Sequence, residues 1–354
     1  MKVGILTFHR AKNFGAVLQC YALFNFLKSN GYDVYVIDYK PPYLAGIGDE
    51  GSLWKQIKLL AKSLFYWLMN AGETGLGNVF NRFVEKELKL AELTAVNSMD
   101  VIVCGSDQIW NPAICKGFDP IFFGGSPILP EKRVISYAAS MGRSEFSGKE
   151  RMEFLKLIER MNAISVREYS TGDLLQSWGV KCDVVVDPVL LAGCECFKNI
   201  LVSIRQHKPY VLVYELTPLR GTYSFAKRIA AQLDADVVVI GGGAKKYFCR
   251  GIKNKQGLSP AQFVSYFANA SYVVTNSFHG TAFSILYGKP FYCLKTNTWK
   301  DERIEALLIQ LNQLDRLVDC NNFDFSHGES YSDNQIAQLK SKSKQFLLYS
   351  IRKS

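Results

Sequence analysis

The chain alternates short apolar runs with stretches of helical periodicity over most of its length. Apolar runs of this kind are typical of buried strands, and strands that alternate with helices are typical of βαβ units with parallel pairing. In the first part of the chain, residues 16–29 have the pattern of a helix that ends at Asn30-Gly31. Strands are expected at residues 2–8, 34–38, 101–104, 133–138, 163–166 and 184–186.

A second series of the same kind follows an irregular stretch near residues 196–209. Its expected strands are residues 210–214, 236–240, 272–275 and 290–294, and its expected helices are residues 223–233, 260–269 and 282–287. The pattern predicts the α/β fold class, with two doubly wound Rossmann-like domains that face a cleft. We assign residues 1–200 to the N-terminal domain and residues 201–330 to the C-terminal domain. Residues 331–354 hold a predicted C-terminal helix, which could cross back to the N-terminal domain.

Residues 53–70 depart from this alternation, because their apolar and charged positions follow a helical period. Leucine and isoleucine share one face, Lys55, Lys58 and Lys62 share another, and a tryptophan lies near each end. Such a helix either lies at the surface of an anionic membrane or packs with its apolar face on the first domain. Both interpretations stay open, and the first would make the protein peripheral on the cytoplasmic face of the inner membrane.

Composition and charge narrow the class of protein. Of the 354 residues, 48% are hydrophobic and 21% are charged, as in globular proteins. The net charge of +10 is spread along the chain without a basic block. This distribution disfavours nucleic acid as a partner and suits anionic substrates or an anionic surface. We expect no membrane-spanning helix, since no apolar run reaches 18 residues. We also expect no signal peptide, since residues 1–8 have neither a long enough apolar core nor a small-residue cleavage site.

The nine cysteines predict a reduced, cytoplasmic chain, because their number is odd and no C-x-x-C pair occurs. Cys104 and Cys293 lie in apolar runs, where we expect small core residues. Cys194 and Cys196 form a lone C-x-C without further ligands at a suitable spacing, so the sequence predicts no metal site there.

The turn after the expected strand 272–275 carries the strongest chemical pattern. It reads Asn276, Ser277, Phe278, His279, Gly280 and Thr281. Ligands of parallel sheets bind at the carboxyl ends of strands, and the helix N-terminus that follows can accept phosphate. Gly280 would leave room for the ligand, while Ser277 and Thr281 would add hydroxyl donors. His279 could donate a hydrogen bond or move a proton, and the alternative is a histidine that only caps the helix.

Four stretches together resemble the polysaccharide pyruvyl transferase family. They are residues 7–23, 101–112, 164–171 with 187–191, and 275–290. The resemblance implies a fold like that of GT-B glycosyltransferases. It also implies a reaction, in which the pyruvyl group of phosphoenolpyruvate moves to two hydroxyls of a sugar, a cyclic ketal forms and phosphate leaves. Neither a cofactor nor a metal is implied, and no D-x-D follows an expected strand.

The resemblance places the donor site at the end of the expected strand 163–166 and in the turn around His279. Arg167 could hold the carboxylate or the phosphate of phosphoenolpyruvate bidentately, and the alternative is an ion pair with Glu168 or Asp173. Asn276, Ser277, Gly280 and Thr281 are the further donor-binding candidates, together with Lys295. Some relatives carry a basic residue where this chain has Ser277, so one cation of the site would come from elsewhere, such as Lys295 or Arg303.

The reaction also needs groups that move protons and hold the acceptor. His279 fits as the general acid or as the partner of the departing phosphate, and Asp107 fits as a base for the acceptor hydroxyl or as its orienter. Gly-Ser-Asp is also ordinary turn chemistry, so an Asx-turn or helix cap is the alternative for Asp107. Asn13, Gly15 and Glu215 are the candidates for the acceptor site, although Gly15 could serve backbone geometry alone and Glu215 could be a solvated loop carboxylate.

Two other functions stay open. One is a GT-B glycosyltransferase that uses a sugar nucleotide, which would commonly hold the ribose with a carboxylate in the helix after the phosphate turn. The first acidic residue after His279 is Asp301, so this function is disfavoured. The other is a non-catalytic binding protein of the same fold. The expected partners are phosphoenolpyruvate and a surface glycan or its lipid-linked precursor.

Overall fold

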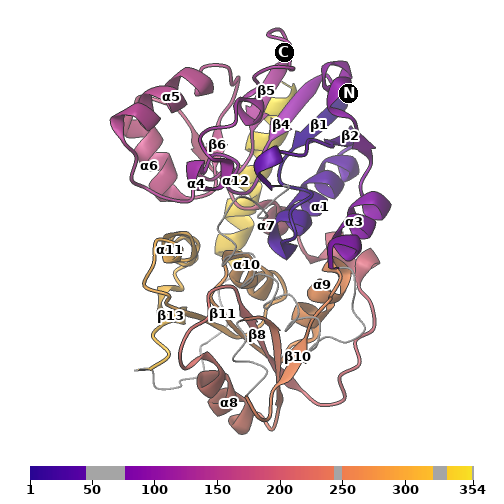
Figure 1. The fold of residues 1–354 in the computed structure, drawn as a ribbon, viewed down its shortest axis with the longest axis vertical. Coiled ribbons are helices and arrows are strands. Elements are labelled where there is room, and N and C mark those ends of the chain that lie inside the picture. The colour runs from indigo at the N-terminus through magenta and orange to yellow at the C-terminus, as the bar shows by residue number, and fades with distance from the viewer. Residues whose placement is uncertain (45–75, 243–248, 322–332, 353–354) are drawn as a thin grey trace, which may run out of the picture.

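The computed structural model describes residues 1–44, 76–242, 249–321 and 333–352, which form two parallel sheets surrounded by helices (Figure 1). The first sheet has the strand order β3-β2-β1-β4-β5, and every pair in it is parallel. Its strands are β1 (Lys2–Leu6), β2 (Asp33–Ile37), β3 (Leu90–Ala91), β4 (Val101–Cys104) and β5 (Arg133–Ser136). The reversal of order between β1 and β4 is a topological switch point, where ligands of such sheets bind.

The second sheet has the strand order β10-β9-β8-β11-β12-β13 and is also parallel throughout. Its strands are β8 (Tyr210–Glu215), β9 (Asp236–Gly241), β10 (Lys253–Lys255), β11 (Tyr272–Thr275), β12 (Phe291–Leu294) and β13 (Leu317–Val318). Its switch point lies between β8 and β11. A short pair, β6 (Ser165–Val166) and β7 (Asp183–Val184), extends the edge of the first sheet through single bridges to residues near β5.

The helices fill the connections between the strands on both sheets. Around the first sheet they are α1 (Phe14–Ser29), α3 (Leu76–Glu87), α4 (Pro112–Cys115), α5 (Gly148–Ile158), α6 (Tyr169–Ser177) and α7 (Pro188–Ala192). Around the second sheet they are α8 (Thr222–Gln232), α9 (Pro260–Asn269), α10 (Phe278–Leu286) and α11 (Asp301–Gln310), and α12 (Asp333–Arg352) ends the chain. Short 3₁₀ helices span Pro42–Leu44, Leu93–Ser98, Pro120–Phe123, Cys194–Ile200 and Leu314–Arg316.

The two sheets confirm the predicted α/β class, with Rossmann-like halves in a GT-B-like arrangement. The apolar runs that predicted the strands are buried, as the runs of β4, β8 and β11 show. The predicted helix at residues 282–287 is wrong at its start, because α10 already begins at Phe278. Ser277 is its N-cap, and a serine at this position satisfies a backbone N–H that would otherwise lack a partner. The domain boundary at residue 200 stays a prediction.

Aromatic side chains join the two halves beside α1. Phe14 of α1 stacks on Phe263 of α9 with a centroid distance of 4.3 Å and an interplanar angle of 11°. Phe197 contacts Tyr21 on one side and Phe283 of α10 on the other, at 5.8 and 5.4 Å. Aromatic pairs of this kind add to the free energy that burial already supplies. The halves therefore share one continuous apolar core at this point.

Helix α12 lies against the first half, although it follows the second half in the chain (Figure 1). Its Leu347 and Ile351 are fully buried in the core that α1 also lines. The Nε of Arg133, in β5, donates to the carbonyl of Ser350 at 2.8 Å, and the hydroxyl of Ser343 accepts from the backbone of the β7–α7 connection. The last helix is thus part of the packing of the first sheet.

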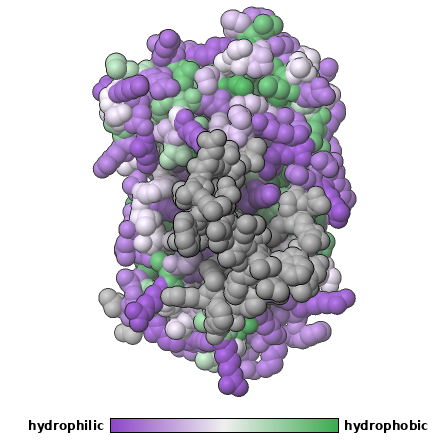
Figure 2. Space-filling view, in the orientation of Figure 1, coloured by the Kyte–Doolittle hydropathy of each residue, from purple (hydrophilic) through white to green (hydrophobic). Residues whose placement is uncertain are grey.

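Two sequence predictions concern the outside of the molecule. Residues 53–70, predicted to be an amphipathic helix, lie outside the described residues, so their membrane contact stays a prediction. None of the helices in the described ranges is long and apolar enough to span a bilayer. Hydrophilic residues cover much of the face in Figure 2, over both halves, with smaller apolar patches between them. Cys104 and Cys293 are buried, as their apolar runs predicted.

Candidate functional site

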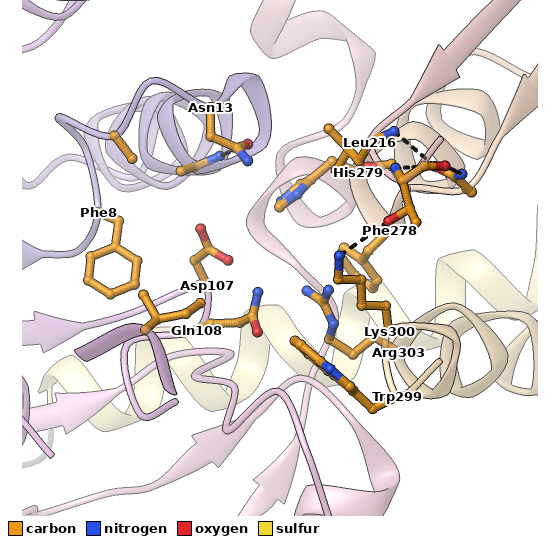
Figure 3. A pocket seen from close by; sticks show the side chains of 16 residues that line it. Phe8, Asn13, Asp107, Gln108, Leu216, Phe278, His279, Trp299, Lys300 and Arg303 are labelled. Carbon is orange, nitrogen blue, oxygen red and sulfur yellow. Dashed lines mark hydrogen bonds between the residues drawn. The ribbon is translucent and has the colours of Figure 1, made fainter. Parts of the chain in front are cut away.

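A cavity of about 430 Å³ lies between the carboxyl ends of the two sheets (Figure 3). The first half contributes the residues that follow β1 and β4, among them Asn13, Asp107 and Gln108. The second half contributes residues that follow β8, β11 and β12. Both switch points therefore open into the same space, which is the expected place for a ligand in folds of this class.

His279 enters this cavity from the first turn of α10. The Ser277 hydroxyl accepts from the Gly280 N–H at 3.4 Å and so caps the helix that carries the ring. The imidazole is 9% exposed, and its Nε2 lies 3.7 Å from Oδ2 of Asp187. This separation is too long for a direct hydrogen bond but short enough for an ion pair when the ring is protonated. In Figure 3 the ring points across the cavity toward the first half.

Asp187 lies next to His279 and belongs to a buried ion-pair network. Its Oδ2 accepts from Nη1 of Arg167 at 3.0 Å and from the Ser106 hydroxyl at 3.2 Å. The Nε of Arg167 donates to Glu168 at 3.0 Å. Burial by itself would raise the pKa of Asp187, yet His279 and Arg167 hold that pKa well below its usual range. Asp187 therefore stays ionised next to the histidine, although we did not name it as a site residue from the sequence.

The expected placement of Arg167 is wrong, because its guanidinium does not line the cavity. Its side chain is 2% exposed, and its planar head lies 4.0 Å from the centroid of the Phe278 ring. Burial would lower the pKa of Arg167, but the carboxylates of Glu168 and Asp187 raise it. The alternative of an ion pair with Glu168 is observed, although this pair is buried. Arg167 thus pairs with Asp187 and packs on the Phe278 ring, outside the cavity.

Two cations that follow β12 line the cavity instead. Arg303 of α11 is half-buried, and the pKa of its guanidinium is lowered by burial and by the positive charge of Arg167. No residue that the structure describes forms a hydrogen bond with its Nε. Lys300 donates from Nζ to the Thr217 hydroxyl at 3.2 Å. A wall that carries two neighbouring cations suits an anionic ligand.

Lys295, the lysine that we named from the sequence, is exposed and lies outside the cavity. It follows β12 directly, whereas the basic residues that reach the cavity come five and eight positions later, at Lys300 and Arg303. Arg303 had been considered only as a replacement for the basic residue that some relatives carry at the position of Ser277. Arg303 lies in the first turn of α11, the helix that follows β12, and this position is the signal that could have favoured it over Lys295.

Gly15 serves the close approach of His279 rather than backbone geometry. A Cβ atom at this position would lie 2.0 Å from Nδ1 of His279 and 2.3 Å from its Cγ. The backbone of Gly15 does not adopt a positive φ, so only space requires glycine here. Residue 15 is therefore a contact between the two halves at the edge of the site, and Gly15 itself does not line the cavity.

Replacing Gly15 by alanine should push the His279 ring out of place. We expect a loss of about 1–3 kcal/mol in stability from the overpacking. Turnover should fall roughly 100-fold, the effect of a misplacement of about 1 Å. Thermal unfolding and phosphate release measure the two effects. Gly148→Ala is the matched control, since a Cβ at Gly148 would meet open space. Normal turnover in Gly15→Ala would contradict this account of the contact.

Gly280 and Thr281 do not contact the cavity, contrary to their predicted donor-binding roles. A Cβ at Gly280 would lie 2.2 Å from Oγ1 of Thr275, so this glycine lets α10 pack on β11. Thr281 is fully buried, and its hydroxyl donates to the carbonyl of Ser277 at 3.0 Å. Both residues position the start of α10, and neither has a free group for a ligand.

Asn276 lines the cavity, but its side chain is already engaged. Its Oδ1 accepts from the backbone of Leu216 at 2.9 Å, and its Nδ2 donates to the carbonyl of Thr217 at 2.6 Å. The asparagine thus holds the loop after β8 against the loop after β11. Ser277 also lines the cavity, although its hydroxyl accepts the capping hydrogen bond of α10.

Glu215 is not an acceptor-binding residue and not a solvated carboxylate. It is 2% exposed and does not line the cavity. Its oxygens accept from the Leu219 N–H at 2.9 Å, the Thr222 hydroxyl at 2.8 Å and the Tyr223 hydroxyl at 2.9 Å. The carboxylate therefore fixes the loop that begins α8.

Asp107 and Asn13 face the cations from the first half. Asp107 adopts a φ of 74°, a conformation that aspartate tolerates better than most residues. No hydrogen bond to its carboxylate occurs among the described residues, so it is neither a helix cap nor an Asx-turn there. Asn13 caps α1 by accepting from the Gly15 N–H at 2.8 Å. In Figure 3, Asp107 and His279 lie on opposite sides of the same space.

The arrangement combines an anion-binding wall with a carboxylate opposite to it. His279, Lys300 and Arg303 could neutralise a small anion with more than one negative charge. Asp107 could accept a proton from a hydroxyl that lies between the two walls. Within the described residues, no group of three or more His, Cys, Asp or Glu side chains could hold a metal ion.

Comparisons with known proteins show the family and the fold of the chain. The family model described as polysaccharide pyruvyl transferase matches residues 13–298. Among solved structures, a UDP-GlcNAc 2-epimerase from Methanocaldococcus jannaschii is 13% identical with a TM-score of 0.50, covering 100% of this chain and 94% of its own. Another UDP-N-acetylglucosamine 2-epimerase is 12% identical with a TM-score of 0.51, covering 98% and 95%. At such identities the likeness shows the fold alone. No curated protein matches the chain.

Proposed function

Because the chain belongs to the polysaccharide pyruvyl transferase family, we propose that it moves the pyruvyl group of phosphoenolpyruvate onto two hydroxyls of one sugar. The product is a cyclic ketal, and the leaving group is phosphate. The acceptor is a surface polysaccharide or its lipid-linked precursor. The observation that carries this proposal is the half-buried guanidinium of Arg303, whose Nε has no hydrogen-bond partner among the described residues and which lines the same cavity as Lys300 and His279.

This wall suits the two anionic groups of phosphoenolpyruvate. A guanidinium can hold a carboxylate or a phosphate through two parallel hydrogen bonds, and Lys300 adds a point charge next to it. The N-terminus of α10 adds partial positive charge beside His279. We assign the phosphate to the side of His279 and the carboxylate to Arg303. This assignment leaves C2 and C3 of the enol turned toward the first half.

The proposed chemistry then needs two protons to move. When the first sugar hydroxyl adds to C2, its proton goes to Asp107, and C3 takes up a proton to become the methyl group. When the second hydroxyl replaces the phosphate at C2, its proton leaves and the phosphate departs with the bonding electron pair. His279, which lies 3.7 Å from the ionised Asp187, is the donor for C3 or for the departing phosphate when its ring is protonated. In the net change, two O–H bonds, the C2–C3 π bond and the C2–O bond to phosphate break. Two C2–O bonds to the sugar and one C–H bond at C3 form, and one proton leaves with the phosphate.

The donor site is tested by replacing Arg303 with methionine, which removes the charge and keeps most of the side-chain volume. We expect phosphoenolpyruvate to raise the melting temperature of the wild type, because a ligand that binds only the native state stabilises it. The variant should bind the donor roughly 10- to 100-fold more weakly, since a hydrogen bond to a charged group contributes about 1.5–3 kcal/mol.

Arg151→Met is the matched control, because Arg151 packs near Trp178 and lies outside the cavity. Its donor-induced shift should equal that of the wild type. An equal shift in Arg303→Met would contradict the donor assignment. UDP-sugars belong in the same panel, and stabilisation by one of them but not by phosphoenolpyruvate would favour a glycosyltransferase.

One observation weighs against a sugar-nucleotide donor. The carboxylate of Asp301, the first acidic residue after His279, accepts from the backbone of Thr296 and Asn297 and from the Thr296 hydroxyl. It is therefore committed to the loop before α11 and does not line the cavity. A non-catalytic binding protein would show the donor-induced shift without phosphate release in the presence of acceptor sugars, so the release assay separates these two functions.

A further inference from the structure

A second cavity of about 320 Å³ lies beside the first and also has walls from both halves. Asn111 and Ala113 of the first half line it, together with Arg143, and Trp299 and Glu302 line it from the second half. The two cavities adjoin, because Trp299 lines both of them. Neighbouring residues also divide between them, so that Glu302 lines the second cavity and Arg303 lines the first.

We propose that this second cavity holds the sugar ring of the acceptor and that Trp299 is the platform on which the ring lies. The proposal rests on the proposed function and adds to it the place and the residue that select the acceptor. Trp299 is a large hydrophobic side chain that is 43% exposed. No residue that the structure describes accepts a hydrogen bond from its indole N–H. The aromatic face can cover the C–H face of a sugar, and the N–H can donate to a hydroxyl.

The polar residues of the second cavity differ from those of the donor wall. Arg143 shares this space with two carboxylates, since Glu145 and Glu302 also line it. Mixed donors and acceptors suit hydroxyls, which both donate and accept hydrogen bonds, better than they suit an anion with several charges. The volume is at the low end of the roughly 300–1,000 Å³ that small-molecule sites occupy. A neutral sugar ring therefore fits this cavity better than phosphoenolpyruvate does.

Arg143 is held in place before a ligand arrives. Its guanidinium pairs with Glu150 and lies 4.6 Å from the centroid of the Phe146 ring. Its buried Nε has no hydrogen-bond partner among the described residues. A donor that is already ordered loses less conformational entropy on binding than a flexible surface side chain.

The second cavity is linked to the proposed base. Nδ2 of Asn111 donates to Oε1 of Gln108 at 2.8 Å, which joins a wall of the second cavity to a wall of the first. Asp107 precedes Gln108 in the chain and lines the first cavity. A sugar on Trp299 would thus lie next to the space where Asp107 faces the donor wall (Figure 3).

The test measures sugar binding directly, without turnover. Saturation-transfer NMR is recorded with methyl β-D-galactopyranoside, methyl β-D-glucopyranoside and methyl α-D-mannopyranoside against the wild type, Trp299→Ala and Trp299→Phe. We expect ring-proton signals from at least one glycoside with the wild type and with Trp299→Phe. Binding to Trp299→Ala should be weaker by roughly tenfold or more, as for the loss of a central aromatic contact. Leu314→Ala is the control, because Leu314 is also exposed in the second half and lies outside both cavities.

The thermal shift with phosphoenolpyruvate is measured on the same four proteins and should be retained in the wild type, Trp299→Phe and Leu314→Ala. Equal glycoside signals with Trp299→Ala and the wild type would overturn the proposal, and so would the absence of a signal from every glycoside with the wild type. In both cases a preserved donor shift would leave the proposed function standing. Loss of the donor shift in the wild type would instead contradict the proposed function itself.

Discussion

His279→Gln is expected to lower phosphate release by about 10²- to 10⁴-fold, which is the usual contribution of a general acid or base. Glutamine keeps a polar side chain of similar reach but cannot deliver a proton to C3 or to the leaving phosphate. Asp187 remains paired with Arg167 in this variant, so the fold should survive. Single-turnover release of phosphate from phosphoenolpyruvate, at saturating acceptor, measures the chemical step and separates it from weaker binding.

His9→Gln is the matched control for this experiment. His9 is also a buried histidine beside an aspartate, with its Nε2 3.0 Å from Oδ1 of Asp38, but it does not line the cavity. Its replacement should affect stability more than turnover. If His279→Gln releases phosphate at a near-normal rate while His9→Gln does the same, the assignment of a proton-transfer role to His279 is wrong.

Arg167→Met should cost about 3–5 kcal/mol of the free energy of unfolding, since breaking a buried ion pair leaves the partner charge uncompensated. Here two partners, Asp187 and Glu168, lose their hydrogen-bonded cation. The resemblance implied a direct grip on the donor, which would predict a variant of normal stability with weak donor binding. Urea-induced unfolding, followed by circular dichroism, distinguishes the two because the midpoint shifts only when stability changes.

The same variant has a pH signature. The lowered pKa of Asp187 stabilises the wild type above about pH 4, the range of an unfolded aspartate, and this contribution is lost as the pH falls through the folded pKa. In Arg167→Met, protonation relieves the uncompensated charge instead. The difference in unfolding midpoint should therefore narrow on acidification. Lys89→Met, which breaks the exposed pair with Asp33, should change little. An unchanged midpoint in Arg167→Met at pH 7 would contradict the structural role.

The fold could be predicted from the sequence because its signals are local. Apolar runs such as β8 and β11 are buried on both faces in a parallel sheet, so they lack alternation and stand out from the helices between them. The residues at strand ends were also found, since His279 and Asp107 follow β11 and β4 directly. Position along the chain was sufficient for these two, because the carboxyl ends of parallel strands meet at one edge.

The roles of the other side chains depend on partners far away in the sequence. Arg167 was expected in the cleft, but Asp187, 20 positions later, holds it in the interior. Glu215 was expected at the acceptor, but the start of α8 uses all of its oxygens. Whether a charged side chain is paired or free is decided by tertiary packing, which strand and helix periodicity do not encode. Arg303 became visible as a cation of the cavity wall only when its surroundings were known.

Helix α12 has a consequence for the synthesis of the protein. Its Leu347 and Ile351 complete the core of the first half, which is otherwise built from the beginning of the chain. A ribosome makes the first sheet well before this helix, at about 5–20 residues per second. During translation the nascent first half therefore lacks part of its apolar packing until α12 has been made. Final closure of that half must wait for the synthesis of a segment that follows the whole second half in the chain.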